Sequence, residues 1–161
     1  MPVDAERYAN CHIYVDAADP GTLVDRLRPA LGVAAVTPTS PDLVFGPLLV
    51  TGASNDYATG ARAHPDDFLE WPVVPECDAV PGAAPAETVE AVSALLRCLW
   101  NRGYAALATC DFEDELPCAG GATRHPPPTR PSRGPGTLAG RAVRRVIRSV
   151  DPGVRRRGRR T

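Results

Sequence analysis

The sequence predicts an α+β protein with a mainly antiparallel sheet, two helices on one face of that sheet, and a disordered basic C-terminal tail. Three observations support this prediction. Short runs rich in branched and aromatic residues are typical of strands, two segments carry apolar residues at helical spacing, and the composition changes sharply after residue 118. The expected order is β-α-β-β-β-α-β, which is compatible with a ferredoxin-like arrangement.

The first strand and the first helix have clear boundary signals. Residues 11–15 (CHIYV) alternate, so the odd-numbered side chains of this strand are expected to face the core. Asp19 is a suitable N-cap, Pro20 suits the first helical position, and Gly32 suits the C-terminal stop. Leucines at helical spacing between these positions predict a helix with one apolar face.

The middle of the domain is expected to contain three further strands. Residues 33–37 and 42–52 have strand composition and are separated by a Pro-Thr-Ser-Pro turn, and the polar residues 53–67 predict a long loop. Residues 68–80 have strand composition but contain two prolines, which cannot donate to a ladder. This segment is therefore predicted to be an edge strand or two short pieces, although a ferredoxin-like order would place it centrally.

The second helix is the clearest element of the sequence. Pro85 opens it, Gly103 closes it, and apolar residues recur between them at 3.6-residue spacing. Residues 105–112 (AALATCDF) then predict the last strand, which runs directly into a group of carboxylates.

Charge divides the chain into two parts. Residues 1–118 hold 18 acidic residues and 6 Arg, a net charge of −12, whereas residues 119–161 hold 12 Arg and one Asp, a net charge of +11. We expect an acidic α+β domain (1–118), a Pro/Gly/Arg-rich linker (119–137) and a basic tail (138–161) with a short amphipathic helix. The candidates in the tail for binding nucleic acid or an anionic surface are Arg141, Arg144, Arg145, Arg148, Arg155, Arg156 and Arg157. Two other interpretations are that the tail binds its own acidic domain, or that it has no selected role.

The cysteine spacing and the length of the apolar runs indicate the cellular compartment in which we expect the protein. The five Cys have neither disulfide-framework nor zinc-site spacing. The chain opens with a polar, acidic stretch, and no apolar run approaches the length of a membrane span. We expect a reduced, cytoplasmic protein with no transmembrane segment.

The stretch TCDFEDELP contains four carboxylates, which we call the acidic cluster (Asp111, Glu113, Asp114 and Glu115). If the strand continues, Asp111, Glu113 and Glu115 share one face. The cluster is then a solvated strand end, a metal site, an acid/base pair or a surface for a basic partner. The sequence contains no phosphate loop, nucleophile elbow, dinucleotide fingerprint or paired metal-ligand spacing. We therefore expect no catalytic residue, no metal and no cofactor.

Two stretches resemble a family of small, acidic bacterial α+β proteins that are immunity-protein-like and poorly characterised. They are HPDDFLEWPVVPECDAV and LLRCLWNRGYAALATCDFEDELP, which together span about residues 64–118. The resemblance makes signature positions of Asp67, Phe68, Trp71, Asp111, Phe112, Glu113, Asp114 and Leu116. In size, acidity and organisation, members of this family resemble the immunity proteins of bacterial toxin systems.

These observations favour a non-enzymatic binding protein that uses an acidic surface to neutralise a basic, toxin-like protein partner. The predicted partner-binding residues are Asp66, Asp67, Trp71, Asp111, Glu113, Asp114 and Glu115. The alternative is a nucleic-acid-associated protein that binds through the Arg-rich tail, and a third hypothesis is a metal-dependent hydrolase at the acidic cluster.

Overall fold

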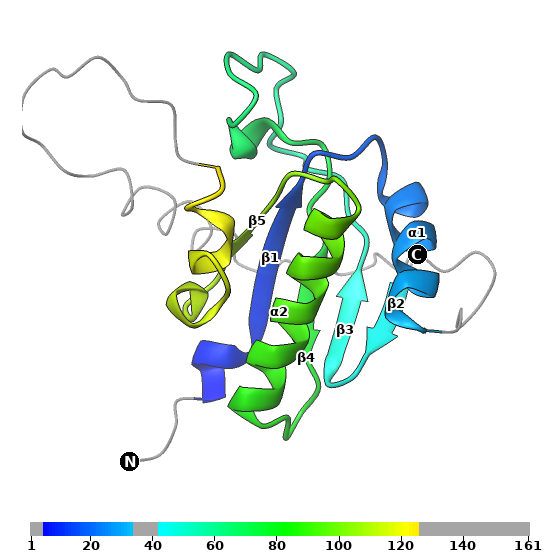
Figure 1. Cartoon of the computed structure of the whole chain (residues 1–161), viewed down its shortest axis with the longest axis vertical. Coiled ribbons are helices and arrows are strands. Elements are labelled where there is room, and N and C mark those ends of the chain that lie inside the picture. The colour runs from blue at the N-terminus through cyan, green and yellow to red at the C-terminus, as the bar shows by residue number, and fades with distance from the viewer. Residues whose placement is uncertain (1–4, 34–41, 126–161) are drawn as a thin grey trace, which may run out of the picture. The chain divides into compact units, whose positions relative to one another are not determined.

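The computed structural model describes residues 5–33 and 42–125. These residues belong to the first of two compact units, Met1–Pro128, and none lies in the second, Thr129–Thr161. The described residues form a five-stranded antiparallel sheet in the order β2-β3-β4-β1-β5, with two helices on one face (Figure 1), which confirms the predicted α+β class. The elements are β1 (Asn10–Val15), α1 (Pro20–Leu31), β2 (Asp42–Phe45), β3 (Leu48–Thr51), β4 (Glu76–Ala79), α2 (Pro85–Asn101) and β5 (Ala106–Thr109).

Both helices begin and end where the sequence predicts. The Asp19 carboxylate accepts a hydrogen bond from the backbone N–H of Thr22 at 2.8 Å, so the first turn of α1 has a side-chain cap. Gly32 follows this helix with φ +67°, a left-handed conformation that glycine adopts without strain. Pro85 opens α2, and Gly103 follows its C-terminal end.

The segment 42–52 forms two strands where the sequence predicted one. Gly46 has φ +55°, and the chain reverses at Gly46–Pro47 so that β2 and β3 pair as a hairpin. Of the strand predicted at 33–37, residues 34–37 lie outside the described part of the chain.

The proline-containing segment is not an edge strand, so that alternative is wrong, whereas the other alternative, two short pieces, agrees with an isolated bridge at Val73 and the short strand β4. β4 lies between β3 and β1 near the middle of the sheet, and it begins at Glu76, just after Pro75. The Pro75 carbonyl accepts from Ile13 N–H at 3.0 Å and the Pro72 carbonyl accepts from Asn55 N–H at 2.8 Å. Both prolines therefore contribute acceptors, but neither can donate, so the Ile13–Pro75 pair of the ladder has one backbone hydrogen bond where Val15 and Val73 exchange two. If β2 is set aside, the order β3-β4-β1-β5 with α1 and α2 is the predicted ferredoxin-like one.

The face of the sheet beneath α1 and α2 contains the main hydrophobic core. The odd-numbered residues of β1 are buried there, as predicted, together with Leu27 of α1 and three leucines of α2 (Leu95, Leu96 and Leu99). Cys11 of β1 pairs with Cys77 of β4 in this layer. Burial raises the pKa of the Cys77 thiol, so these cysteines act as small apolar core residues.

The described residues cover the opposite face at one end. There Tyr14 and Leu107, paired across β1 and β5, pack against the fully buried Trp71. Phe68, from a 3₁₀ helix (Phe68–Glu70) in the long 52–75 connection, lies at 5.2 Å, centroid to centroid, from the Tyr14 ring. The long loop predicted for 53–67 thus folds over part of this face.

The folded unit continues past Cys118, the predicted end of the domain. A 3₁₀ turn at Ala119–Gly121 packs along the outer edge of β5, where both glycines are buried. A Cβ on Gly121 would lie 2.6 Å from the carbonyl oxygen of Ala106, so only glycine fits. The Trp100 indole N–H donates to that same carbonyl at 3.0 Å, and the Arg124 guanidinium lies 4.7 Å from the centroid of the Trp100 ring. Together these contacts cover an edge strand that would otherwise be open to pairing.

No helix in the described ranges 5–33 and 42–125 is long and apolar enough to cross a membrane.

Candidate functional site

The acidic cluster lies in a turn and not on a strand, so the predicted alternation of its side chains is wrong. β5 ends at Thr109, and residues Glu113–Glu115 form a 3₁₀ helix. The side chains on either side of this turn, Phe112 and Leu116, are buried in the main core. Burial of these two apolar side chains holds the turn against the sheet and leaves the carboxylates between them outside.

Arg7 and Tyr8 of the N-terminal 3₁₀ helix (Ala5–Tyr8) bind the acidic cluster. The Arg7 Nη2 atom lies 3.2 Å from Asp114 Oδ1 and 3.0 Å from Glu115 Oε1. Arg7 Nε donates to the backbone carbonyl of Asp111 at 3.1 Å. The Tyr8 hydroxyl donates to Glu115 Oε1 at 2.7 Å. This hydrogen bond to the carboxylate is the main reason that the Tyr8 pKa is raised, because it favours the protonated hydroxyl.

The aromatic ring of Tyr8 also stacks on Phe112, with centroids 5.2 Å apart. The cluster thus serves one structural purpose, which is to attach the start of the chain to the end of β5. Arg7 and Tyr8 were not among the residues singled out from the sequence. More than 100 residues separate them from the cluster, so no local pattern connects the two.

The site contains four carboxylates and one guanidinium, which pairs with two of them, so the site keeps a net negative charge. The Asp114 side chain is 75% exposed even while it contacts Arg7. Asp111 is exposed and Glu113 is half-buried, and neither carboxylate bonds to another side chain in the described ranges. Within those ranges, no three Asp, Glu, His or Cys side chains are grouped closely enough to hold a metal ion. The arrangement can attract and hold a cationic group.

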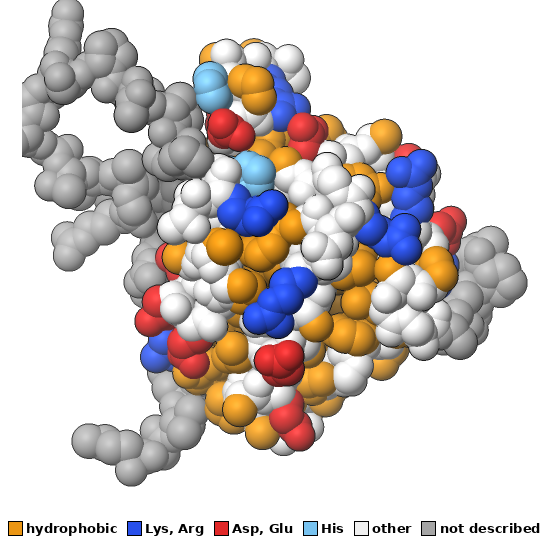
Figure 2. Space-filling model, viewed as in Figure 1, with side chains coloured by type: hydrophobic (Ala, Val, Ile, Leu, Met, Phe, Trp, Pro, Cys, Tyr) orange, Lys and Arg blue, Asp and Glu red, His pale blue; other side chains and the backbone are white. Residues whose placement is uncertain are grey.

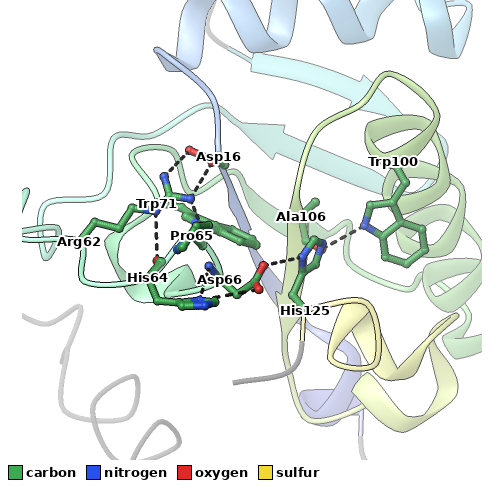
Figure 3. Close-up of polar contacts among 9 residues, drawn as sticks. All are labelled: Asp16, Arg62, His64, Pro65, Asp66, Trp71, Trp100, Ala106 and His125. Carbon is green, nitrogen blue, oxygen red and sulfur yellow. Dashed lines mark hydrogen bonds and ion pairs between the residues drawn. The ribbon is translucent and has the colours of Figure 1, made fainter. Parts of the chain in front are cut away.

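A second polar group gathers at the opposite end of β1, in the 52–75 connection (Figure 3). The Arg62 guanidinium binds both carboxylate oxygens of Asp16, at 3.0 and 2.8 Å, and also donates to the Pro65 carbonyl. The bond to Asp16 is the main cause of the raised pKa of Arg62. The Trp71 indole donates to the same Pro65 carbonyl at 2.9 Å.

Asp66 belongs to this second group and lies between two histidines. His125 Nδ1 is 3.4 Å from Asp66 Oδ1, and His64 Nδ1 is 3.8 Å from Asp66 Oδ2. The His125 ring meets the Trp71 ring edge-on at 5.2 Å. These contacts attach the chain beyond β5 to the loop that covers Tyr14. These contacts are structural. The sequence predicts His125 to lie in the linker, whereas the structure places it in the folded unit.

The predicted partner-binding residues therefore do not form a single surface. Asp66 and Asp67 lie beyond the C-terminal end of β1, whereas the acidic cluster lies beside the 3₁₀ helix that precedes β1 (Figure 1). Six residues of extended strand separate the two ends, which is about 20 Å. Trp71 is fully buried and cannot reach a partner from the surface. The Arg residues proposed for the tail (141–157) lie outside the described residues.

No protein-family model matches this chain, and it matches neither a curated protein nor a solved structure.

Proposed function

We propose that this protein is a non-enzymatic, immunity-like binding protein that uses its acidic surface to hold and neutralise a basic protein partner. The observation that carries the proposal is the exposed acidic cluster, in a domain that bears a charge of −12 over residues 1–118. A field of one sign attracts a partner of opposite charge and speeds its association.

Two features of the cluster support binding. Arg7 and the buried Phe112 fix the turn, so the carboxylates are held in place before a partner arrives. Asp111 and Glu113 have no side-chain partner in the described ranges, so no side chain of those ranges competes with a cation at these two groups. General acid/base chemistry needs two carboxyl groups in unlike environments within a cleft, and these four side chains surround an exposed turn.

The test is direct binding to a partner from the native host. The full chain would be used to capture proteins from the host, and each captured protein would then be purified and its affinity measured. We expect a basic partner whose affinity falls about tenfold in Asp111→Asn/Glu113→Gln, since each exposed ion pair contributes up to about 1 kcal/mol. Co-expression should also relieve any toxicity of that partner.

A matched control removes the same charge from α2, outside the acidic cluster. Glu87→Gln/Glu90→Gln changes two exposed carboxylates of α2 and should leave the affinity within about twofold. Equal losses in the two double variants would show that net charge alone, and not the acidic cluster, determines binding. Failure to find any basic partner would end the proposal.

Nucleic-acid binding through the tail is the second candidate, and its support is the 12 Arg among residues 119–161. A chain that ends at Pro128 distinguishes the two functions, because it keeps residues 119–125, which pack against β5. Loss of nucleic-acid binding together with intact partner binding would assign each function to its own part of the chain.

A further inference from the structure

The described residues leave the sheet face opposite the helices open over β2, β3 and β4. Strand pairing sets side chains in rows on this face, and one row contains Val44, Leu49, Asp78 and Asn10. The next row contains Asp42, Thr51, Glu76, His12 and Thr109. The Tyr14–Leu107 pair lies in the following row and is the one that Trp71 covers. Within the described part of the chain, the first row is exposed and has no packed layer above it, whereas in the second row only Glu76 is exposed and the other four side chains are half-buried.

Apolar side chains gather on this open face. Val44 is 47% exposed, Leu49 is 38% exposed and Val80 is 43% exposed. Val80 follows β4 and donates its N–H to the Pro47 carbonyl at 2.8 Å, so it continues the alternation on the same side as Asp78. Three of the five large apolar side chains that are exposed in the described part of the chain therefore lie together. A contiguous apolar patch with a polar border is typical of an interaction surface.

The charge of this face has one sign. Glu76 and Asp78 are exposed, Asp42 is half-buried, and none of the five described strands contains an Arg. His12 is the only histidine of these strands, and its Nε2 lies 4.0 Å from Glu76 Oε1. The outer surface of the helix side differs, because Arg, acidic and apolar side chains all lie on it (Figure 2). Apolar and acidic side chains are thus immediate neighbours on the open face, with Leu49 directly opposite Asp78.

We propose that this open sheet face, comprising Val44, Leu49, Glu76, Asp78 and Val80, is the contact surface for a basic protein segment that carries Arg or Lys beside an apolar stripe. The inference rests on the proposed function and specifies where and how the partner binds. The apolar side chains of the partner segment cover Val44 and Leu49, and its Arg or Lys side chains pair with Glu76 and Asp78. A second copy of this chain does not fit, because two such faces would place like charges against each other.

The acidic cluster then has a supporting role. Asp78 pairs with Asn10 at the start of β1, and the acidic cluster lies beside the 3₁₀ helix that precedes this residue. Both sets of carboxylates therefore lie toward the same end of β1. The cluster adds to the field that attracts a cation, whereas the open sheet face supplies the apolar area that a lasting contact needs.

A designed peptide probe tests this inference on the full chain. The probe is a helical peptide with Leu along one face and Arg on both sides of that face. A scrambled peptide of identical composition has the same charge but no apolar stripe, and a third peptide has Gln in place of Arg. In the ¹⁵N-labelled protein, we expect the probe to shift the amide resonances of Leu49, Glu76 and Asp78.

Variants then identify the groups that bind. Glu76→Gln/Asp78→Asn should weaken the probe about tenfold, and Val44→Ser/Leu49→Ser should reduce its binding to that of the scrambled peptide. The control Glu87→Gln/Glu90→Gln should bind as the wild type does. All these side chains are exposed, and urea unfolding of each variant checks that the fold is kept.

The results of the peptide experiment distinguish failure of the open sheet face as the contact surface from failure of the proposed binding function. If the shifts and the loss of affinity occur only at Asp111 and Glu113, the open sheet face is overturned and the proposed function stands. If the wild type binds neither Arg-containing peptide, or binds the Gln peptide equally well, both the surface and the acidic-binding function are overturned.

Discussion

The two faces of the sheet are covered by different means. On one face, α1 and α2 bury a continuous layer that extends from Leu43 in β2 to Ala108 in β5. On the other, one fully buried indole, that of Trp71, covers the Tyr14–Leu107 pair, and no side chain of residues 5–33 or 42–125 packs as a layer above β2, β3 and most of β4. Helices cover a face along its length, whereas a loop covers only what its longest side chains reach. The incomplete cover is what leaves an apolar and acidic surface available.

The largest expected effect is at Trp71, which covers one end of the open face. Trp71→Ala should lower the free energy of unfolding by about 3–5 kcal/mol, because it leaves a cavity between the 52–75 connection and Tyr14. Urea unfolding measures the loss, and hydrogen exchange should show the Val73 and Asn55 amides opening first.

Tyr57→Ala is the control in the same connection, since this ring is 63% exposed and should contribute within about 0.5 kcal/mol. A small loss for Trp71→Ala would mean that the loop does not depend on its indole, and the contrast between the covered and open ends would be lost.

The helix-covered and open faces can be compared directly with two leucines. Leu96 of α2 is fully buried in the main core, and Leu96→Ala should lower the free energy of unfolding by about 2–5 kcal/mol. Leu49→Ala makes the same chemical change on the open face, where the side chain is 38% exposed, and should cost within about 0.5 kcal/mol. Similar losses at the two positions in urea unfolding would show that something packs on the open face of the isolated protein.

Local signals predicted the helix-covered face well. Asp19, Pro20 and Gly32 set the limits of α1 through contacts within four residues, and the spacing of leucines in α2 states which side is buried. The position of β4 could not be predicted from its prolines alone. Pro72 and Pro75 suggest a weak edge strand, but their effect depends on which carbonyls the neighbouring strands need.

The candidate site was predicted only in part. The run of carboxylates identified the acidic cluster, but its turn geometry comes from the burial of Phe112 and Leu116. The contact with Arg7 depends on tertiary structure that no spacing in the sequence encodes. The open face was missed for a related reason. Val44 and Asp78 lie more than 30 residues apart, and only strand pairing brings their rows together.

An intermediate effect is expected at the covered edge of β5. Gly121→Ala should cost about 1–3 kcal/mol, because its φ of +105° is strained for alanine and the new Cβ would meet the Ala106 carbonyl. Detachment of residues 119–125 would expose the edge, so the Ala106 and Ala108 amides, which alternate with those that bond β1, should exchange faster.

Gly60→Ala separates the two causes of that loss. Gly60 also has a positive φ, +76°, but a Cβ there would meet nothing within 4 Å. It should cost about 1 kcal/mol and leave the exchange of the β5 amides unchanged. If both variants accelerated that exchange equally, the close approach of Gly121 to β5 would not be what protects the edge.

The smallest expected effect is at the N-cap of α1, the shorter of the two helices that cover the sheet. The hydrogen bond from the backbone N–H of Thr22 is the main cause of the lowered pKa of Asp19 in the folded state. A carboxyl group whose pKa is lower in the folded than in the unfolded state stabilises the fold fully above its unfolded pKa of about 4, and this contribution is lost as the pH falls through the folded value.

Asn caps equally well without titrating. The melting temperatures of wild type and Asp19→Asn should therefore run parallel above about pH 5, and the wild type should fall more steeply below about pH 4. Asp19→Ala should be less stable than either at neutral pH. Parallel melting curves for wild type and Asp19→Asn down to acid pH would show that ionisation of Asp19 does not stabilise the fold.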